Sequence, residues 1–440
     1  MKYRSILSVL VVAASLMTAG AKTPSRVADY KTMPDRYQSG AQQYAYPVPE
    51  KGIPVLTPAP KGYEPFHMEH YGRHGSRWLI GENVYSKPVQ LLERADSLGQ
   101  LTPSGRELLR RMRIVAEAYK GHDGELTEVG HRQHRGIANR MSKNFPQLFT
   151  DSTYLDARSS MVIRCILSMA NEVAELERLN PGIHTRQDAS ASTQDLMAPP
   201  GFPCTNRPAD DNTWRRDSLA AHVNNDHSAF IAKVFKDPEL AKKELKADKI
   251  FNGAANVALN SQSHDGLYDI YEWFTLPELQ GKWKVDNAKW YIHGGNTSLT
   301  GNRPPYRVIN LLRDIVQGAD TAVVSKNPTV NLRFGHDSVV VPLVCMLELG
   351  TYGVDVDNLD KLQDYWRDYE VTPMAANVQF VFYRPEGKGA ARPEDVLVKV
   401  LHNEAETTLP IPTDTWPYYK WTDVRDYWQS KVDTFNEFCK

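Results

Sequence analysis

Residues 65–77 read PFHMEHYGRHGSR, an apolar-rich segment that ends in a glycine and a cluster of charged side chains. We expect Pro65 to Tyr71 to form a strand and the six residues from Gly72 to Arg77 to follow it as a turn. Two guanidinium groups flank one imidazole, and a glycine lets backbone come close, as an anion site beside a nucleophile requires. By average residue usage, a chance R-H-G-x-R match is expected in well under about one in a hundred chains of this length. The segment therefore indicates a strand whose end carries an anion site.

Further along the chain, helical and strand patterns alternate. Pro103 stands in the first turn of one predicted helix, and apolar residues then recur at helical spacing. A later apolar stripe steps by four, three, four and three residues from Val162 to Leu176, and Arg164 lies off that stripe. The patterns predict helices at about 102–119, 128–145, 162–176, 308–316, 339–349 and 424–435, and strands at 154–157, 329–334, 377–383 and 396–401, the last two as an antiparallel pair.

The chain changes character between about residues 181 and 289, where Pro/Asn/Asp-rich loops and a Lys-rich helical stretch replace the alternation. We predict that this range is a mainly helical cap inserted into an α/β core made of residues 22–180 and 290–440. Residues 1–21 resemble a cleavable signal peptide, with Lys2 and Arg4 before an apolar run and small residues at the end. A periplasmic or secreted location is therefore expected.

Bulk properties exclude several classes of function. Lys and Arg total 52 and Asp and Glu total 53, so no overall field favours nucleic acid or an anionic membrane surface. No run after the signal reaches the roughly 20 apolar residues that a membrane helix needs. The four cysteines show no C-x-x-C spacing, and their pairing cannot be deduced; Cys165 and Cys345 lie in apolar stretches and are expected to be buried.

Five stretches of the chain occur in the order found in a known family, and together they cover most of the mature sequence outside the insertion. The chain resembles the histidine acid phosphatases, a branch of the histidine phosphatase superfamily that includes phytases and inositol polyphosphate phosphatases. The stretches are Arg73 to Arg77, Gly124 to His134, Arg158 to Arg164, His336-Asp337, and Val398 to Asn403. The resemblance implies a phosphoglycerate-mutase-like α/β fold, with a mixed, mostly parallel sheet flanked by helices and a helical cap.

The resemblance also implies a role for each matching residue in the hydrolysis of phosphate monoesters without a metal or other cofactor. His74 would be the nucleophile that becomes phosphorylated, and Asp337 would protonate the leaving alcohol. The phosphate oxygens would be held by Arg73, Arg77 and Arg164, with His336 as a further donor and Arg158 assisting. One departure is visible: the family usually has a proline two residues after the second arginine, where this chain has Trp78-Leu79.

Elementary electrostatics agrees with these implied roles. Nearby cations disfavour an imidazolium, so His74 should stay neutral even in mild acid. Asp337 must begin protonated, which the arginines oppose and a bound phosphate dianion favours. We therefore expect an acidic pH optimum. The related inositol polyphosphate phosphatases often carry His-Ala-Glu where this chain has His336-Asp337, so the donor resembles the acid phosphatase and phytase pattern. Phytate or another sugar-like phosphate is the expected substrate.

Other polar clusters are interpreted as structural. The pairs His122-Asp123 and His264-Asp265 do not follow a buried strand, so we expect loop residues there. His293-Gly294-Gly295 is expected to be a turn, residues 131–135 a solvated helix face partly lining the cleft, and the lysines of 242–249 surface. Two alternatives stay open: a metal-dependent phosphoesterase, and a phosphate-binding protein without catalysis. The oligomeric state is also open.

Overall fold

A single mixed sheet forms the centre of the molecule. The computed structural model describes residues 28, 30–47, 55–81, 83–204, 226–387 and 389–440, so the predicted signal peptide lies outside the described residues. The strand order is β3-β2-β4-β1-β5-β6-β7, with β8 paired to β6. The strands are β1 (Tyr63–Arg73), β2 (Tyr154–Ser159), β3 (His184–Asp188), β4 (Thr329–Gly335), β5 (Asn377–Pro385), β6 (Leu397–His402), β7 (Ala405–Glu406) and β8 (Tyr418–Lys420).

Parallel pairing is confined to one half of this sheet. β1 to β4 pair parallel with one another, and β5, β6, β7 and β8 are joined by antiparallel pairing. The predicted α/β fold with a mixed sheet is confirmed, and so is the antiparallel pair β5 and β6. Because β1 and β4 are parallel neighbours, their carboxyl ends lie together at one edge of the sheet.

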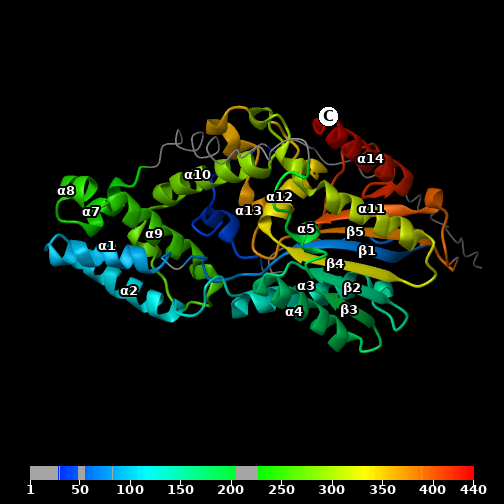
Figure 1. Cartoon of the computed structure of the whole chain (residues 1–440), viewed down its shortest axis with the longest axis horizontal. Helices are drawn as coiled ribbons and strands as arrows, with labels where there is room; N and C mark the ends of the chain where they lie inside the picture. Colours follow the sequence, from blue (N-terminus) through cyan, green and yellow to red (C-terminus); the bar gives the residue numbers. More distant parts are fainter. Residues whose placement is uncertain (1–27, 29, 48–54, 82, 205–225, 388) are drawn as a thin grey trace, which may run out of the picture.

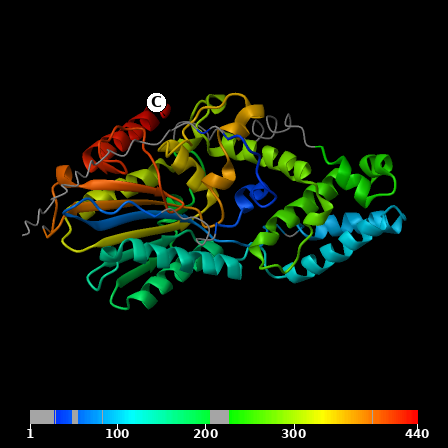
Figure 2. The same cartoon turned by 180° about the vertical axis from the view of Figure 1, so that it is seen from behind.

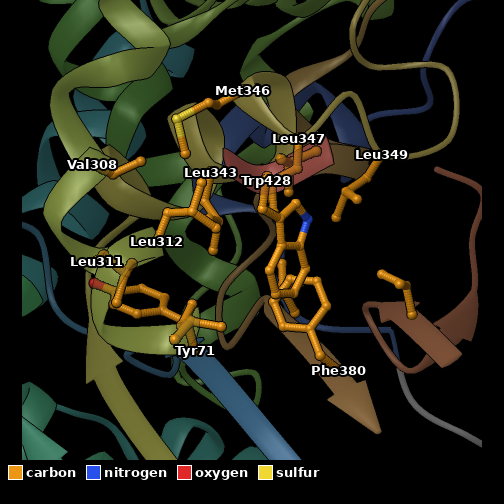
Figure 3. Close-up of a cluster of buried hydrophobic side chains, with 14 of the residues drawn as sticks. Tyr71, Val308, Leu311, Leu312, Leu343, Met346, Leu347, Leu349, Phe380 and Trp428 are labelled. Carbon is orange, nitrogen blue, oxygen red and sulfur yellow. The ribbon is translucent and has the colours of Figure 1, made fainter. Parts of the chain in front are cut away.

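Helices cover both faces of the sheet (Figures 1 and 2). α3 (Glu128–Asn144) and α4 (Ile163–Leu179) pack on one face, and α11 (Ile309–Val323), α12 (Asp337–Met346) and α14 (Trp421–Phe438) pack on the other. Figure 3 shows Leu312, Leu343 and Trp428 of the second group beside Tyr71 and Phe380 of the sheet. Burying one such large apolar side chain stabilises a fold by roughly 1.5–3 kcal/mol.

Side-chain caps fix where two of the predicted helices begin. Thr102 Oγ1 accepts a hydrogen bond of 3.0 Å from the Gly105 amide at the start of α2 (Pro103–Tyr119). Thr127 Oγ1 accepts one of 3.4 Å from the Gly130 amide at the start of α3. Such caps satisfy amide groups that have no partner within the helix. The Thr127 amide and hydroxyl also donate to the Ser76 carbonyl, at 2.9 and 3.1 Å, so the first turn of α3 lies next to the segment that follows β1.

A second body of helices lies beyond the end of the sheet (Figure 1, left). Its hydrophobic cluster is separate from those of the sheet and joins residues of 78–119 to residues of 230–279. Its helices are α1 (Ser86–Ser97), α2, α7 (Ser228–Val234), α8 (Pro238–Glu244) and α9 (Ala247–Asn260), and α10 (Leu276–Gly294) runs from it toward the core. Shorter helices are α5 (Gln194–Met197) and α13 (Asp368–Val371).

The predicted boundaries of the cap need correction in two places. β3 lies within the range 181–289 assigned to the cap, yet it pairs with β2 in the sheet. α1 and α2 lie within the range assigned to the core, yet their apolar stripes face α7 and α9. Helical periodicity reveals that a stripe is buried but not against which partner, so it could not separate these two arrangements.

The two cysteines that lie in apolar stretches of the sequence are buried, as expected. Cys165 and Cys345 are buried and free, whereas Cys204 and Cys439 form a disulfide that ties the loop after α5 to the end of α14. Within the described ranges, none of the helices has the length and apolar character needed to cross a membrane.

Candidate active site

The carboxyl ends of β1 and β4 bring the two halves of the predicted site together. Arg73 and Gly335 are register partners, and the His74 amide donates to the Gly335 carbonyl at 3.0 Å. The next residues of β4's chain, His336 and Asp337, therefore lie beside Arg73 and His74. The His74 and His336 rings are 5.7 Å apart in an edge-to-face arrangement. Arg73 Nη2 donates to Asp337 Oδ2 at 2.8 Å.

A close approach of two glycines holds the loop after β1 against α3. A Cβ on Gly75 would lie 2.7 Å from the Gly130 Cα, and a Cβ on Gly130 would lie 2.3 Å from the Ser76 carbonyl oxygen. The Ser76 amide donates to Gln133 Oε1 at 2.8 Å, and Gln133 Nε2 donates back to Ser76 Oγ at 3.0 Å. No larger residue fits at either glycine without moving backbone, so this contact fixes the position of the loop.

The helix α4 supplies further support and the third arginine. The Gly75 amide donates to Ser168 Oγ at 3.1 Å, and Ser168 Oγ donates to the Arg164 carbonyl at 2.8 Å. The Arg164 guanidinium lies over the 121–125 loop, because a Cβ on Gly124 would be 3.4 Å from Arg164 Nη1. In the part of the chain that is described, the buried Nε atoms of Arg73, Arg77 and Arg164 have no hydrogen-bond partner.

The charge of one carboxylate, that of Asp337, acts on the guanidinium groups of Arg73 and Arg77. Arg73 is fully buried, and burial lowers its pKa, although the negative charge of Asp337 raises it in part. Burial and the neighbouring Arg73 also lower the pKa of Arg77 to about 10, with Arg164 adding to the effect. Cations held this close repel one another, and a bound anion relieves that repulsion. The arrangement therefore favours a doubly charged anion such as phosphate.

His74 carries the proton on a defined nitrogen. Its Nδ1 lies 3.0 Å from the Gly75 carbonyl oxygen, which can only accept, so Nδ1 is the protonated atom and Nε2 holds a lone pair. Burial lowers the pKa of His74 well below its ordinary value of 6.5, and the charges of Arg73, Arg77 and Arg164 lower it further. A neutral imidazole with a free Nε2 is the form that can act as a nucleophile.

The pKa values of the two residues after β4, His336 and Asp337, are both lowered. Burial lowers the pKa of His336 to about 4, and its Nε2 lies 3.2 Å from Ser160 Oγ. Burial raises the pKa of Asp337, but Arg73 and Arg77 oppose this effect and the net result is a lowered pKa. Asp337 also begins α12, where the helix dipole favours a negative charge. Its carboxyl group therefore needs a nearby anion before it can hold a proton.

Arg158 is the one predicted phosphate ligand that the structure does not bring to this group. Its guanidinium lies 3.2 Å from Asp156 and 3.1 Å from Asp314 of α11. Side chains alternate along β2, so Arg158 lies on the face opposite to Ala157, which packs with α3 and α4. Its predicted assisting role is replaced by a structural one, in an ion-pair network that also includes Arg333.

The remaining polar clusters give a mixed outcome. His122-Asp123 and His264-Asp265 are loop residues as expected, but both histidine rings contact Trp78, which directly follows Arg77. The prediction of a solvated helix face at 131–135 is wrong for His134. This residue is buried, and its Nδ1 lies 2.9 Å from Glu172 Oε2 of α4.

Two further predictions concerned single segments of the cap. The lysines of 242–249 are exposed as predicted. His293 belongs to the last turn of α10 rather than to a turn outside a helix.

One buried amide in the cap was missed by sequence reasoning. Asn260 Nδ2 donates to the Arg77 carbonyl at 3.1 Å, and Asn260 Oδ1 lies 3.0 Å from His264 Nε2 and 3.2 Å from the Tyr85 hydroxyl. Asn260 ends α9, in a range without a recognisable motif, so only its burial in three dimensions reveals the contact. It connects the cap to the loop that carries the arginines.

The fold and the site together define an α/β protein with a buried histidine next to three arginines at the carboxyl ends of its central strands. The family model of the histidine phosphatase superfamily (branch 2) matches residues 98–403, and the chain belongs to this superfamily. A comparison with curated proteins gives no match. Among the described residues, no three His, Cys, Asp or Glu side chains are grouped so that they could hold a metal ion.

Solved structures with similar folds include a multiple inositol polyphosphate phosphatase and a phytase. The multiple inositol polyphosphate phosphatase of Bifidobacterium longum, in complex with inositol hexasulfate, has a TM-score of 0.71 and 19% sequence identity, over 89% of this chain and 97% of that chain. The phytase from D. castellii has a TM-score of 0.60 and 15% identity, over 90% of this chain and 85% of that chain. At these identities the likeness shows a common fold.

Proposed function

We propose that this phosphatase hydrolyses organic phosphate monoesters through a covalent phosphohistidine on His74. The observation that carries the proposal is the neutral imidazole of His74, with Nδ1 bonded to the Gly75 carbonyl and Nε2 free among three guanidinium groups. Phosphoryl transfer depends mainly on positioning and on stabilising charge at the equatorial oxygens, and a fixed set of arginines does both.

The reaction proceeds in two displacements. In the first, His74 Nε2 forms a bond to phosphorus while the bond from phosphorus to the ester oxygen breaks, and the Asp337 carboxyl gives its proton to that oxygen. In the second, water attacks phosphorus, the bond from phosphorus to Nε2 breaks, and the Asp337 carboxylate takes the proton of the water. One carboxyl group thus serves as acid and then as base.

Substrate and location form part of the same proposal. The inositol phosphates expected from the family are supported by the two solved relatives, whose names refer to inositol polyphosphate and phytate chemistry. Export to the periplasm or beyond is supported by the Cys204–Cys439 disulfide, because an oxidising compartment allows such a bond to persist.

The test is a panel of phosphate esters at pH 4 to 7 with wild type and His74→Ala. The variant should lose at least about a thousandfold in kcat on an aryl phosphate, because it lacks the imidazole that forms the covalent intermediate. The matched control is His184→Ala, which removes an exposed imidazole from the edge strand β3 and should leave kcat unchanged.

Hydrolysis by His74→Ala at the wild-type rate would refute the mechanism. The two alternative classes are separated in the same panel. Loss of activity on chelation with EDTA would indicate a metal-dependent phosphoesterase. Stoichiometric phosphate binding by wild type without any turnover would indicate a binding protein.

A further inference from the structure

The segment that precedes the sheet in the chain reaches the candidate active site. Residues 30–47, which include the short helix η1 (Gln38–Gln43), lie between the cap helices and the sheet, in dark blue in Figures 1 and 2. The Gln42 carbonyl oxygen accepts a hydrogen bond of 2.6 Å from Arg73 Nη1. We call residues 37–45 the arm loop. A segment outside the stretches of the family resemblance thus contacts a guanidinium group of the site.

This contact uses a defined part of the donors of Arg73. Its Nη1 donates to the carbonyls of Gln42 and Thr372, at 2.6 and 2.7 Å, and its Nη2 donates to Asp337 Oδ2 at 2.8 Å. Of the N–H groups that a guanidinium carries, those on Nε and one on Nη2 remain for a phosphate. The two carbonyls on Nη1 therefore set the direction in which the remaining donors point.

The Gln42 carbonyl follows an uncommon backbone conformation at Ala41. Ala41 has φ 55° and ψ −131°. Glycine adopts such a positive φ readily, whereas other residues rarely do. The methyl group of Ala41 is buried in one cluster with Trp283 of α10 and Tyr369 of α13. Without support from its surroundings, alanine at this position would relax to a negative φ and turn the next carbonyl away from the guanidinium.

One side chain of the cap holds both ends of the arm loop. Gln262 lies in η4 (Ser261–Ser263), directly after α9. Its Oε1 accepts a hydrogen bond of 2.9 Å from the Ala45 amide, and its Nε2 donates to the Tyr37 carbonyl at 3.1 Å. Gly40 leaves room for this amide group, because a Cβ there would lie 2.8 Å from Gln262 Nε2. The cap thus holds the arm loop in the shape that meets the site.

The core holds the arm loop at a different point. The Met374 amide donates to the Tyr44 carbonyl at 2.8 Å, and the Tyr44 amide donates to the Ala41 carbonyl at 3.0 Å within the loop. Loss of Gln262 therefore leaves the residues after the turn attached to the core and frees those before it. Ala41 is then the pivot about which the loop can relax.

We propose that Gln262 and Ala41 are positioning residues for Arg73, so that the cap sets the geometry of the phosphate site through the arm loop. The inference rests on the proposed function, because it takes Arg73 to bind the phosphate group of the substrate. While Gln262 holds the loop, Ala41 stays at positive φ and the Gln42 carbonyl fixes the guanidinium. Neither positioning residue touches the substrate itself.

The test measures the dissociation constant of inorganic phosphate by isothermal titration calorimetry, which needs no turnover. Gln262→Met keeps the side-chain volume and removes its hydrogen bonds. A residue in a sparsely populated backbone region favours its relaxed form by about tenfold once the support is lost. The site is then competent about a tenth of the time, so the dissociation constant should rise about tenfold. Gln262→Ala removes the same bonds with a different shape and should give the same change.

Glycine at position 41 gives a result that a general loss of stability would not. Glycine populates positive and negative φ about equally, so the loop in Gln262→Met/Ala41→Gly should be competent about half the time. This double variant should bind phosphate within about threefold of wild type, although it lacks the buried methyl group of Ala41. Ala41→Gly alone should keep the wild-type dissociation constant, because Gln262 still holds the loop.

The matched control is Gln280→Ala. Gln280 also ties residues 30–47 to the cap, since its Nε2 donates to the Pro34 carbonyl at 2.7 Å. Pro34 lies outside the arm loop, so this variant should keep the wild-type dissociation constant.

Three results would overturn the inference while leaving the proposed function intact. The first is an unchanged dissociation constant in Gln262→Met and Gln262→Ala, and the second is the absence of rescue by glycine at position 41. The third is an equal weakening in Gln280→Ala, which would show that any loosening of residues 30–47 has the same effect. Absence of both phosphate binding and ester hydrolysis in wild type would instead refute the proposed function.

Discussion

Adding one methyl group at Gly130 should disable the site from a distance. The Cβ of Gly130→Ala would lie 2.3 Å from the Ser76 carbonyl oxygen, whereas ordinary contact begins near 3.4 Å. Backbone around Ser76 must therefore move by about 1 Å, and a displacement of that size in a positioning element can cost about a hundredfold in rate. We expect kcat/KM on an aryl phosphate to fall by about a hundredfold, although alanine by itself favours a helix by about 1 kcal/mol.

The matched control lies six residues further along the same helix. The Cβ of Gly136→Ala would meet only the Arg140 guanidinium, 2.9 Å from Nη1, and this nitrogen is the end of a side chain and not backbone. The control should keep wild-type kcat/KM and raise the melting temperature by about 1 °C, because helix propensity adds about 1 kcal/mol. Wild-type kcat/KM in Gly130→Ala would refute the argument that the two glycines fix the loop.

Three more outcomes are expected. Asp337→Asn should slow alkyl phosphates at least about tenfold more than aryl phosphates, whose leaving groups need no proton, and equal losses in kcat would contradict the acid role. Asn260→Ala should raise the inhibition constant of inorganic phosphate about fivefold, because the Arg77 carbonyl loses a hydrogen bond worth about 1 kcal/mol. An unchanged inhibition constant would show that Asn260 does not position Arg77. Lowering the pH from 7 to 5 should reduce the free energy of unfolding, measured by denaturant titration. Burial lowers the pKa of several histidines to about 4 or less, so below about pH 6.5 these histidines take up protons only in the unfolded state. A free energy of unfolding that does not change with pH would contradict this sign. The histidines with these pKa values are His70, His264, His336 and His402, and burial also lowers the pKa of His74 well below 6.5.

Local periodicity predicted most helices and strands, because the spacing of apolar residues reports which face is buried. The turn after β1 and the His336-Asp337 turn after β4 were placed correctly at strand ends, and parallel pairing then brings them together. Arg73 and Asp337 are 264 residues apart, yet they form an ion pair. The order of the motifs along the chain made this contact predictable, and no local pattern would have done so.

What the sequence could not supply are partners that are distant along the chain. Arg158 follows the same strand-end rule as Arg73, but Asp314 of α11 binds its guanidinium. His134 stands in a helix of mostly polar composition, and Glu172 of α4 makes it a buried residue. Helices α1 and α2 were assigned to the core because their apolar stripes have the spacing of any buried helix. Their packing against α7 and α9 shows that they belong to the cap. In each case the deciding group comes from another element.

In the proposed mechanism, the ion pair between Arg73 and Asp337 would link substrate binding to the protonation of the acid. Arg73 Nη1 is held by the carbonyl oxygens of Gln42 and Thr372, so the guanidinium stays in place while its Nη2 donates to Asp337. A phosphate dianion that binds Arg73 competes for this positive charge and adds its own negative charge beside Asp337. Both effects raise the pKa of the carboxyl group, so a proton is taken up when substrate binds and is then available to the leaving oxygen. The same arginines lower the pKa of His74 and of Asp337, so in the proposed mechanism one set of charges would prepare first the nucleophile and then the acid.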